Sequence, residues 1–174
     1  MTWEIGEEIV KKILEKAPYA EGRVRRERRL EFKIPAERIR EFLMIMKENN
    51  FPLMLQISAV DWVRDGEIEL VYHLMNIELG THAMVKVRIP RDLDKAKMPT
   101  VRDIYPAAET YERDVHDFFG VYFEGNDKME MPWILDDPER GLYPHRKDFD
   151  MLGYVKKKYK ILDRFDENKD KYVI

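Results

Sequence analysis

Three strand-like runs in the middle of the chain constrain its fold more than any other feature of the sequence. They are predicted at residues 53–63, 68–79 and 82–89. Asp65-Gly66 is a strong signal for a tight hairpin between the first two runs, and Gly80-Thr81 forms the turn into the third. In the third run apolar residues alternate with polar ones, as in a strand with one buried face. Because strands joined by short turns pair with one another, we predict a β-meander.

Two helical patterns and one further strand precede the meander. Apolar residues recur at helical spacing over residues 2–17 and 36–49. Between them, residues 22–34 are predicted as a single strand, because its apolar residues fall on alternate positions. We therefore predict an α+β domain over residues 1–125 in the order α-β-α-β-β-β-α, with helices packed on a mixed or antiparallel sheet. Residues 126–174 are predicted to follow it as an extended tail.

The last predicted helix, residues 107–119, has an apolar side and a densely charged side. At about 100° per residue, the apolar set is Ala108, Tyr111, Val115, Phe118 and Phe119, and the ionisable set is Glu109, Glu112, Arg113, His116 and Asp117. Arg113 lies four residues from both Glu109 and Asp117, so the two carboxylates could hold it. Gly120 suits the left-handed position that ends many helices. The charged side is either a solvated face or a contact with another surface.

After this helix the chain becomes irregular but stays apolar. Prolines and glycines with little periodicity predict an extended tail, too irregular for a helix. Its large apolar residues are Trp133, Ile134, Leu135, Leu142, Tyr143, Phe149, Met151, Leu152 and Tyr154. Because such a tail is poorly suited to solvent, we expect it to lie along another surface. Before the helix, residues 98–100 are predicted to begin a short helical turn with Thr100 as its N-cap.

Composition argues against several classes of function. The chain has no cysteine, which removes disulfides, thiolate nucleophiles and cysteine-ligated clusters. The formal net charge of −3 gives no reason to expect nucleic acid, and the arginine-rich run at residues 23–29 lacks a nucleic-acid reading motif. No apolar run approaches the roughly 18 residues of a membrane span, so we expect a soluble protein. A charged fraction of 37% is typical of thermophilic proteins.

The four histidines give weak support for a metal centre. His73 and His82 flank a hairpin turn and could face one another, although a metal site there would also need nearby carboxylates. Glu112 and His116 share a helical face and could provide two ligands. A small metal-dependent enzyme using Glu112, His116 and a hairpin histidine is therefore an alternative of a different class. With no phosphate-binding loop or metalloprotease motif, we expect no catalytic residue, metal or cofactor in this chain.

Ordered motifs between residues 98 and 149 resemble a known family. The first blocks are Met98-Pro99-Thr100-Val101, Tyr105-Pro106-Ala107-Ala108 and Tyr111-Glu112-Arg113-Asp114-Val115-His116-Asp117-Phe118-Phe119-Gly120-Val121. The later blocks are Phe123-Glu124-Gly125 and Pro144-His145-Arg146-Lys147-Asp148-Phe149. Together these blocks resemble the 30 kDa subunit family of respiratory complex I (NADH dehydrogenase). The preceding order of helices and strands agrees with that family's fold in outline.

The chain departs from the family pattern at several positions. Asp114 stands where the family usually has glutamate, and residues 126–132 and 142–147 replace its usual His-Pro and Gly-His-Pro-Leu-Arg-Lys steps. With the thermophile-like composition, these departures favour the version in archaeal membrane-bound [NiFe] hydrogenases, which are related to complex I. A sulfur-reducing complex, or a dehydrogenase of NADH or of another reduced cofactor, stays open.

The resemblance implies a cofactor-free structural subunit of the peripheral arm, on the cytoplasmic side of the cell membrane. The subunit would dock on a large [NiFe]-hydrogenase-like (49 kDa-like) subunit beside Fe–S subunits, and these partners would hold the NiFe centre and the clusters. The assembly would couple hydrogen evolution to ion translocation. The residues expected to contact partners are Glu109, Glu112, Arg113, His116, Asp117, Trp133, Tyr143, Pro144, Arg146, Lys147, Asp148 and Phe149.

Overall fold

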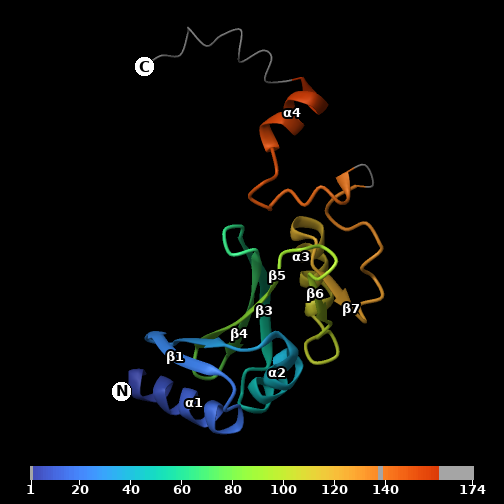
Figure 1. The fold of residues 1–174 in the computed structure, drawn as a ribbon. Helices are drawn as coiled ribbons and strands as arrows, with labels where there is room; N and C mark the ends of the chain where they lie inside the picture. The colour runs from blue at the N-terminus through green and yellow to red at the C-terminus, as the bar shows by residue number, and fades with distance from the viewer. Residues whose placement is uncertain (1, 137–138, 161–174) are drawn as a thin grey trace, which may run out of the picture.

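A computed structural model describes residues 2–136 and 139–160, and a five-stranded sheet lies at the centre of this part of the chain (Figure 1). The strands are β1 (Glu21–Arg26), β2 (Arg29–Lys33), β3 (Leu53–Trp62), β4 (Glu67–Asn76) and β5 (Thr81–Pro90). Their order is β1-β2-β5-β4-β3. β2 and β5 pair in parallel and the other neighbours pair antiparallel, so the sheet is mixed. The predicted α+β fold and the β-meander are confirmed.

The main helices pack on this sheet. They are α1 (Thr2–Lys16), α2 (Ile39–Glu48), preceded by the 3-10 turn η1 (Ala36–Arg38), and α3 (Ala108–Phe119). In Figure 1, α1 lies against β1, α2 lies beside α1, and α3 lies along β3. Ile13 of α1, Phe42 of α2 and Val115 of α3 belong to one core cluster with the inward-facing residues of the strands. Each large apolar side chain buried in it stabilises the fold by about 1.5–3 kcal/mol.

The opposite face of the sheet carries charged side chains that pair across strands. Glu31 on β2 is only 2% exposed and forms ion pairs with Arg23, Arg25 and Lys86. Burial alone would raise the pKa of Glu31, but hydrogen bonds from Lys86 and Arg23 outweigh it and hold the pKa below its ordinary value. Glu31 therefore offsets part of the positive charge in the arginine-rich run.

The predicted single strand at residues 22–34 is wrong, because the chain folds back there as a hairpin. Val24 of β1 pairs with Leu30 of β2, and Arg28 between the strands takes a φ of 58°. The apolar alternation is interrupted at Arg26 and Arg28 because the chain turns there, between the end of β1 and the start of β2. The turn contains no glycine, proline or asparagine, so the usual turn residues do not mark it.

A second, two-stranded parallel sheet lies beside α3. It consists of β6 (Lys97–Pro99) and β7 (Tyr122–Glu124). The predicted start of the helical turn at residue 98 is therefore wrong, because residues 97–99 form a strand, whereas the predicted N-cap role of Thr100 is confirmed. The turn follows at residues 102–104, and Thr100 Oγ1 accepts a hydrogen bond (3.3 Å) from the Arg102 N–H. This second sheet brings the loop after β6 against α3.

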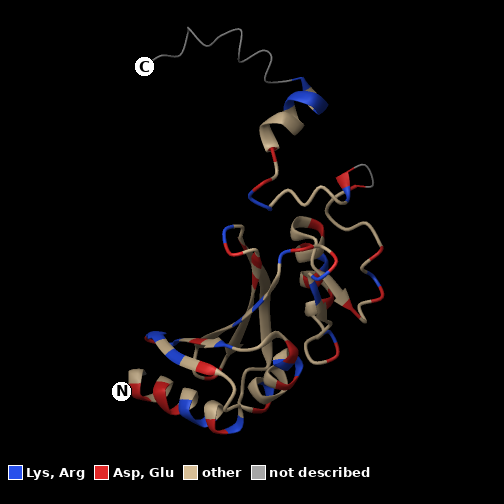
Figure 2. Ribbon diagram, viewed as in Figure 1, with Lys and Arg blue, Asp and Glu red and all other residues tan. Residues whose placement is uncertain are grey.

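The tail is largely irregular up to residue 150, as predicted, and then forms an unpredicted helix, α4 (Met151–Tyr159). Asp150 caps this helix by accepting a hydrogen bond (2.9 Å) from the Gly153 N–H. Figure 1 shows α4 projecting away from the sheet, and Figure 2 shows its basic last turn. Leu152 in its first turn is 66% exposed. The end of the described tail therefore presents an apolar residue to its surroundings.

Candidate partner-docking surface

The ionisable side of α3 is covered by other parts of the same chain. Glu112 is fully buried, and Arg113 and Asp117 are 8% and 5% exposed. A solvated face is therefore the wrong description for these three residues. Gly120 ends the helix in the left-handed region with a φ of 74°, as predicted. A Cβ added to Gly120 would lie 2.9 Å from the Tyr143 ring, so glycine also permits the tail to approach the helix end.

Glu112 ties two loops to α3. Its carboxylate accepts hydrogen bonds from the Thr100 hydroxyl (2.7 Å), the Val101 N–H (2.8 Å) and the Asn126 side-chain amide (2.9 Å). Burial raises the pKa of Glu112, and these three hydrogen bonds lower it only in part. The residue therefore joins the end of β6 and the turn after β7 to the helix.

The neighbouring residues of α3 hold the segment at residues 131–135. Arg113 Nη2 donates to the Pro132 carbonyl (3.0 Å), and its guanidinium carbon lies 4.4 Å from the centre of the Trp133 ring. The Trp133 indole N–H donates to Asp114 (2.5 Å). Asp117 accepts from the backbone N–H groups of Ile134 (2.9 Å) and Leu135 (3.1 Å). α3 thus fixes the backbone from which Trp133 projects.

The charges at the ends of α3's ionisable side have other partners. Glu109 forms an ion pair with Lys128 (2.8 Å). The pair between Glu109 and Arg113 that their helical spacing suggested is therefore not the contact that Glu109 makes. His116 Nδ1 lies 3.1 Å from the Val121 carbonyl, a distance at which the ring N–H donates to that oxygen. Glu112 and His116 therefore make separate contacts. Among the described residues, no group of three or more His, Cys, Asp or Glu side chains could hold a metal.

A buried carboxylate on β3 fastens the later part of the tail, and we call Asp61, Arg91, Lys147 and Asp148 the tail latch. Asp61 is 3% exposed and accepts two hydrogen bonds from the Arg91 guanidinium, at 2.7 and 3.1 Å. It also accepts from the Lys147 backbone N–H (2.8 Å), and Arg91 donates to Asp148 (2.5 Å). Sequence reasoning missed Asp61 and Arg91, although an aspartate within an apolar strand was a visible signal.

Two contacts to the end of α3 support the latch. The His145 ring stacks on Phe118, with ring centres 4.2 Å apart. Arg146 Nε donates to the Phe119 carbonyl (2.8 Å), one of the last carbonyls of the helix. The tail block that carries the predicted contact residues therefore lies against α3 and β3.

The pKa of Asp61 makes the latch sensitive to acid. Burial alone would raise that pKa, but the Arg91 guanidinium and the Lys147 amide outweigh burial and hold it below its ordinary value of 3.8. Because the folded-state pKa is lower than the unfolded one, the ionised residue contributes stability above pH 3.8. That contribution is lost as the pH falls through the folded-state pKa.

Replacing Asp61 with asparagine is expected to release the tail while leaving the sheet folded. The substitution removes the charge that Arg91 faces and costs about 3 kcal/mol, since one partner of a buried ion pair is lost. Trypsin cleavage after Arg146 or Lys147 should become at least about tenfold faster. The matched control is Asp65→Asn, because Asp65 forms an exposed pair with Arg88. Equal cleavage of the two variants would contradict the latch.

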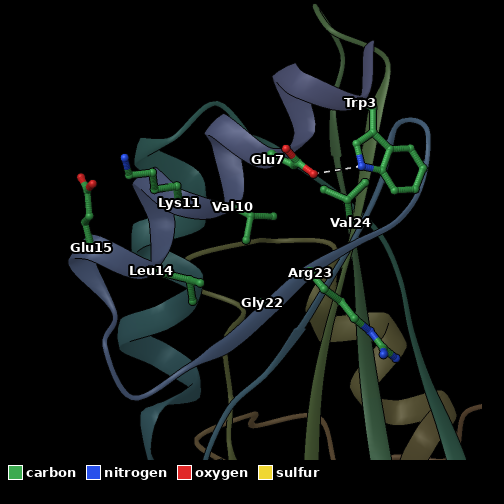
Figure 3. Close-up of a pocket in the computed structure, with 9 residues that line it drawn as sticks. All are labelled: Trp3, Glu7, Val10, Lys11, Leu14, Glu15, Gly22, Arg23 and Val24. Atoms are coloured by element: carbon green, nitrogen blue, oxygen red, sulfur yellow. Dashed lines mark hydrogen bonds between the residues drawn. The ribbon is translucent and has the colours of Figure 1, made fainter. Parts of the chain in front are cut away.

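A groove of about 660 Å³ between α1 and β1 lies apart from these contacts (Figure 3). Val10, Leu14 and Val24 contribute apolar side chains to it. Trp3 lies at one end, where its indole N–H donates to Glu7 (3.0 Å), and Glu15 lies toward the other. None of the residues expected to contact partners lines this groove.

In the described part of the chain, no helix has the length and apolar character needed to cross a bilayer.

Comparison with known proteins identifies consistent relatives. A family model described as the 30 kDa subunit of respiratory-chain NADH dehydrogenase matches residues 32–155. A subunit of the NADH-quinone oxidoreductase of Phenylobacterium zucineum is 35% identical over 72% of this chain and 58% of its own length. The corresponding protein of Rickettsia typhi is 31% identical over 88% of this chain and 77% of its own length. The chain thus spans little more than half of the Phenylobacterium relative.

Two solved structures are also similar. A chain in the structure of the membrane-bound sulfane sulfur reductase, an archaeal respiratory membrane complex, is 87% identical with a TM-score of 0.90. The match covers 97% of this chain and 99% of that chain. A trypsin-resistant fragment of Nqo5 is 25% identical with a TM-score of 0.59, over 68% of this chain and 97% of the fragment.

Proposed function

Because the chain belongs to the respiratory-chain NADH dehydrogenase 30 kDa subunit family, we propose that it is a non-catalytic structural subunit of a complex-I-related membrane complex. It docks on a large subunit related to the [NiFe]-hydrogenase large subunit, next to Fe–S subunits. These partners hold the redox centres, since this chain has no cysteine to ligate a cluster. The chain occupies the cytoplasmic peripheral arm and meets the membrane only through the assembly.

The observation that carries this proposal is the segment at residues 131–135, which contacts from α3 hold in place while several of its large apolar side chains are exposed. Met131, Trp133 and Ile134 are 54%, 44% and 52% exposed, although Arg113, Asp114 and Asp117 fix their segment. An exposed apolar patch on an ordered backbone is typical of a protein–protein interface, where aromatic anchors supply much of the binding energy. We assign the docking surface to this segment, to residues 143–149, which we call the latch block, and to α4.

The residues expected to contact partners divide into three groups on this proposal. Exposed members reach the partner directly: Trp133, Lys147 and Asp148. Half-buried members contribute at the edge of the contact: Glu109, His116, Tyr143, Pro144, Arg146 and Phe149. Buried members hold the docking surface in place: Glu112, Arg113 and Asp117. The buried members act indirectly, through contacts with other residues of this chain.

Within this family, we propose a sulfane-sulfur-reducing assembly that couples its redox reaction to ion translocation. The supporting observation is the 87% identity, over nearly the whole chain, to a subunit of the archaeal sulfane sulfur reductase. The [NiFe] hydrogenase favoured by the sequence motifs becomes the second candidate, because the departures from the complex I pattern fit either assembly. A dehydrogenase has less support, since the two NADH-quinone oxidoreductase subunits described above are only 35% and 31% identical to this chain.

Purification of the native complex tests this proposal. A tag before α1, distant in sequence from the tail, should recover this chain with a large subunit, Fe–S subunits and membrane subunits. The preparation should reduce sulfane sulfur and contain no stoichiometric nickel. Hydrogen evolution together with stoichiometric nickel would show that the complex is the hydrogenase and not the sulfur reductase. Recovery of the chain alone from solubilised membranes would overturn the subunit role.

A further inference from the structure

Two histidines and two methionines lie together on the polar face of the β4–β5 ladder. The register pairs Met75 with His82 and His73 with Met84, so the four side chains occupy neighbouring positions on one face. The alternate residues of both strands face the core and are buried, whereas these four are half-buried. The cluster is therefore shielded but reachable from solvent.

The two imidazoles are joined by a hydrogen bond, and its length is close to the separation of two nitrogen ligands on one metal ion. His73 Nδ1 lies 3.2 Å from His82 Nε2. Two nitrogen ligands about 2.0–2.1 Å from a tetrahedral metal lie roughly 3.3 Å apart. The rings are within 21° of parallel, with centres 5.3 Å apart. Metal binding would require the proton between these two nitrogens to move to His82 Nδ1, so that both facing nitrogens present lone pairs.

Ser58 on β3 supplies the contact that commonly orients a metal-binding histidine. Its hydroxyl oxygen lies 3.0 Å from His73 Nε2, so it can accept a hydrogen bond from that N–H. His73 Nδ1 is then unprotonated and accepts a hydrogen bond from His82 Nε2, a bond that a metal ion would replace. Burial, followed by the nearby His82 and Lys86, lowers the pKa of His73. Burial, followed by Arg29, lowers the pKa of His82. Both rings are therefore neutral near pH 7 and need not lose a proton to bind a metal.

We propose that His73, Met75, His82 and Met84 form a Cu(I) site. Thioether sulfurs are soft ligands that favour Cu(I), whereas Ca²⁺ and Mg²⁺ prefer carboxylates. Glu31, the carboxylate paired across from Met84, is already engaged by Lys86 and two arginines. The nearby Lys86 and Arg29 also repel a divalent cation more strongly than a monovalent one. This proposal departs from the expectation, drawn from the sequence, that the chain binds no metal.

Anaerobic titration of the full-length chain with Cu(I), against the chromogenic chelator bicinchoninate, tests the site. One equivalent of copper should be retained, and X-ray absorption should show both nitrogen and sulfur ligands. Met75→Leu and Met84→Leu keep the side-chain volume nearly constant and should each weaken binding at least about tenfold. His73→Gln should abolish it. Met44→Leu, at an exposed position on α2, is the matched control and should bind as the wild type does.

Several outcomes would overturn the proposal. Loss of all copper to the chelator would exclude the site. Unchanged Cu(I) affinity in both methionine variants would exclude the thioether ligands, as would Zn(II) binding that exceeds Cu(I) binding. Thermal unfolding of each variant shows whether a loss of copper follows from a loss of structure. A variant that melts as the wild type does but no longer retains copper supports direct ligation.

Discussion

Replacing Glu112 with alanine is expected to lower the free energy of unfolding by about 3–4 kcal/mol, because three donors, two of them in buried hydrogen bonds, lose their acceptor. Those donors are the Thr100 hydroxyl, the Val101 N–H and the Asn126 amide. The substitution also leaves a cavity where the side chain is now fully buried. Urea unfolding followed by circular dichroism measures the effect. Glu112→Gln keeps the volume and one acceptor, so its cost should be intermediate.

Glu109→Ala is the matched control, since Glu109 lies one turn away on the same helix and pairs with Lys128 at the surface. A partly exposed pair of this kind contributes about 0–1 kcal/mol. If Glu112→Ala also cost less than about 1 kcal/mol, Glu112 would not join the loops to α3. Other contacts would then have to hold the docking surface in place.

Ending the chain at Arg140 is expected to leave the α+β domain folded and to abolish assembly with the large subunit. The core cluster lies before residue 130 and keeps all its members. Asp61 keeps its two hydrogen bonds from Arg91 after the Lys147 N–H is lost, so no buried carboxylate is left without a partner. The latch block and α4, however, are gone. Co-purification from membranes that express the truncated chain measures the loss.

A chain ending at Lys160 is the control for that truncation, because it keeps the latch block and α4. It should co-purify with the large subunit as the full-length chain does. If the chain ending at Arg140 still co-purified, residues 141–160 would not be needed for docking, and the segment at residues 131–135 would be the only part of the described tail left to provide it. If both truncated chains failed to assemble, docking would require residues beyond 160.

Periodicity was sufficient to predict most of the fold. The β-meander and three helices follow from apolar spacing and from turn residues such as Asp65-Gly66. The β1–β2 hairpin was missed because its turn at Glu27-Arg28 contains none of the usual turn residues. α4 was missed because Gly153 lies in its first turn and its apolar residues have no core to face. Strand pairing determines the hairpin and the Asp150 cap starts α4, and the intrinsic propensities of these residues predict neither.

The site was predictable only in part. Helical spacing found the two sides of α3 but suggested that Arg113 pairs within the helix. Such surface pairs are worth only about 0.2–0.5 kcal/mol, and Arg113 contacts the Pro132 carbonyl and the Trp133 ring instead. The latch joins Asp61 to Arg91 and Lys147, which are far apart in sequence. The residue pattern of a single helix or strand does not predict contacts between residues that are far apart in the sequence.

Lysine cross-linking of the intact complex in native membranes, read by mass spectrometry, tests the docking surface most directly. Lys147 in the latch block and Lys157 in α4 lie on the proposed docking surface, whereas Lys11 and Lys12 lie on α1 at the other end of the domain (Figure 1). Lys147 and Lys157 should cross-link to the large subunit, and Lys11 and Lys12 should not. Cross-links to the large subunit from Lys11 and Lys12, with none from Lys147 or Lys157, would contradict docking through the tail.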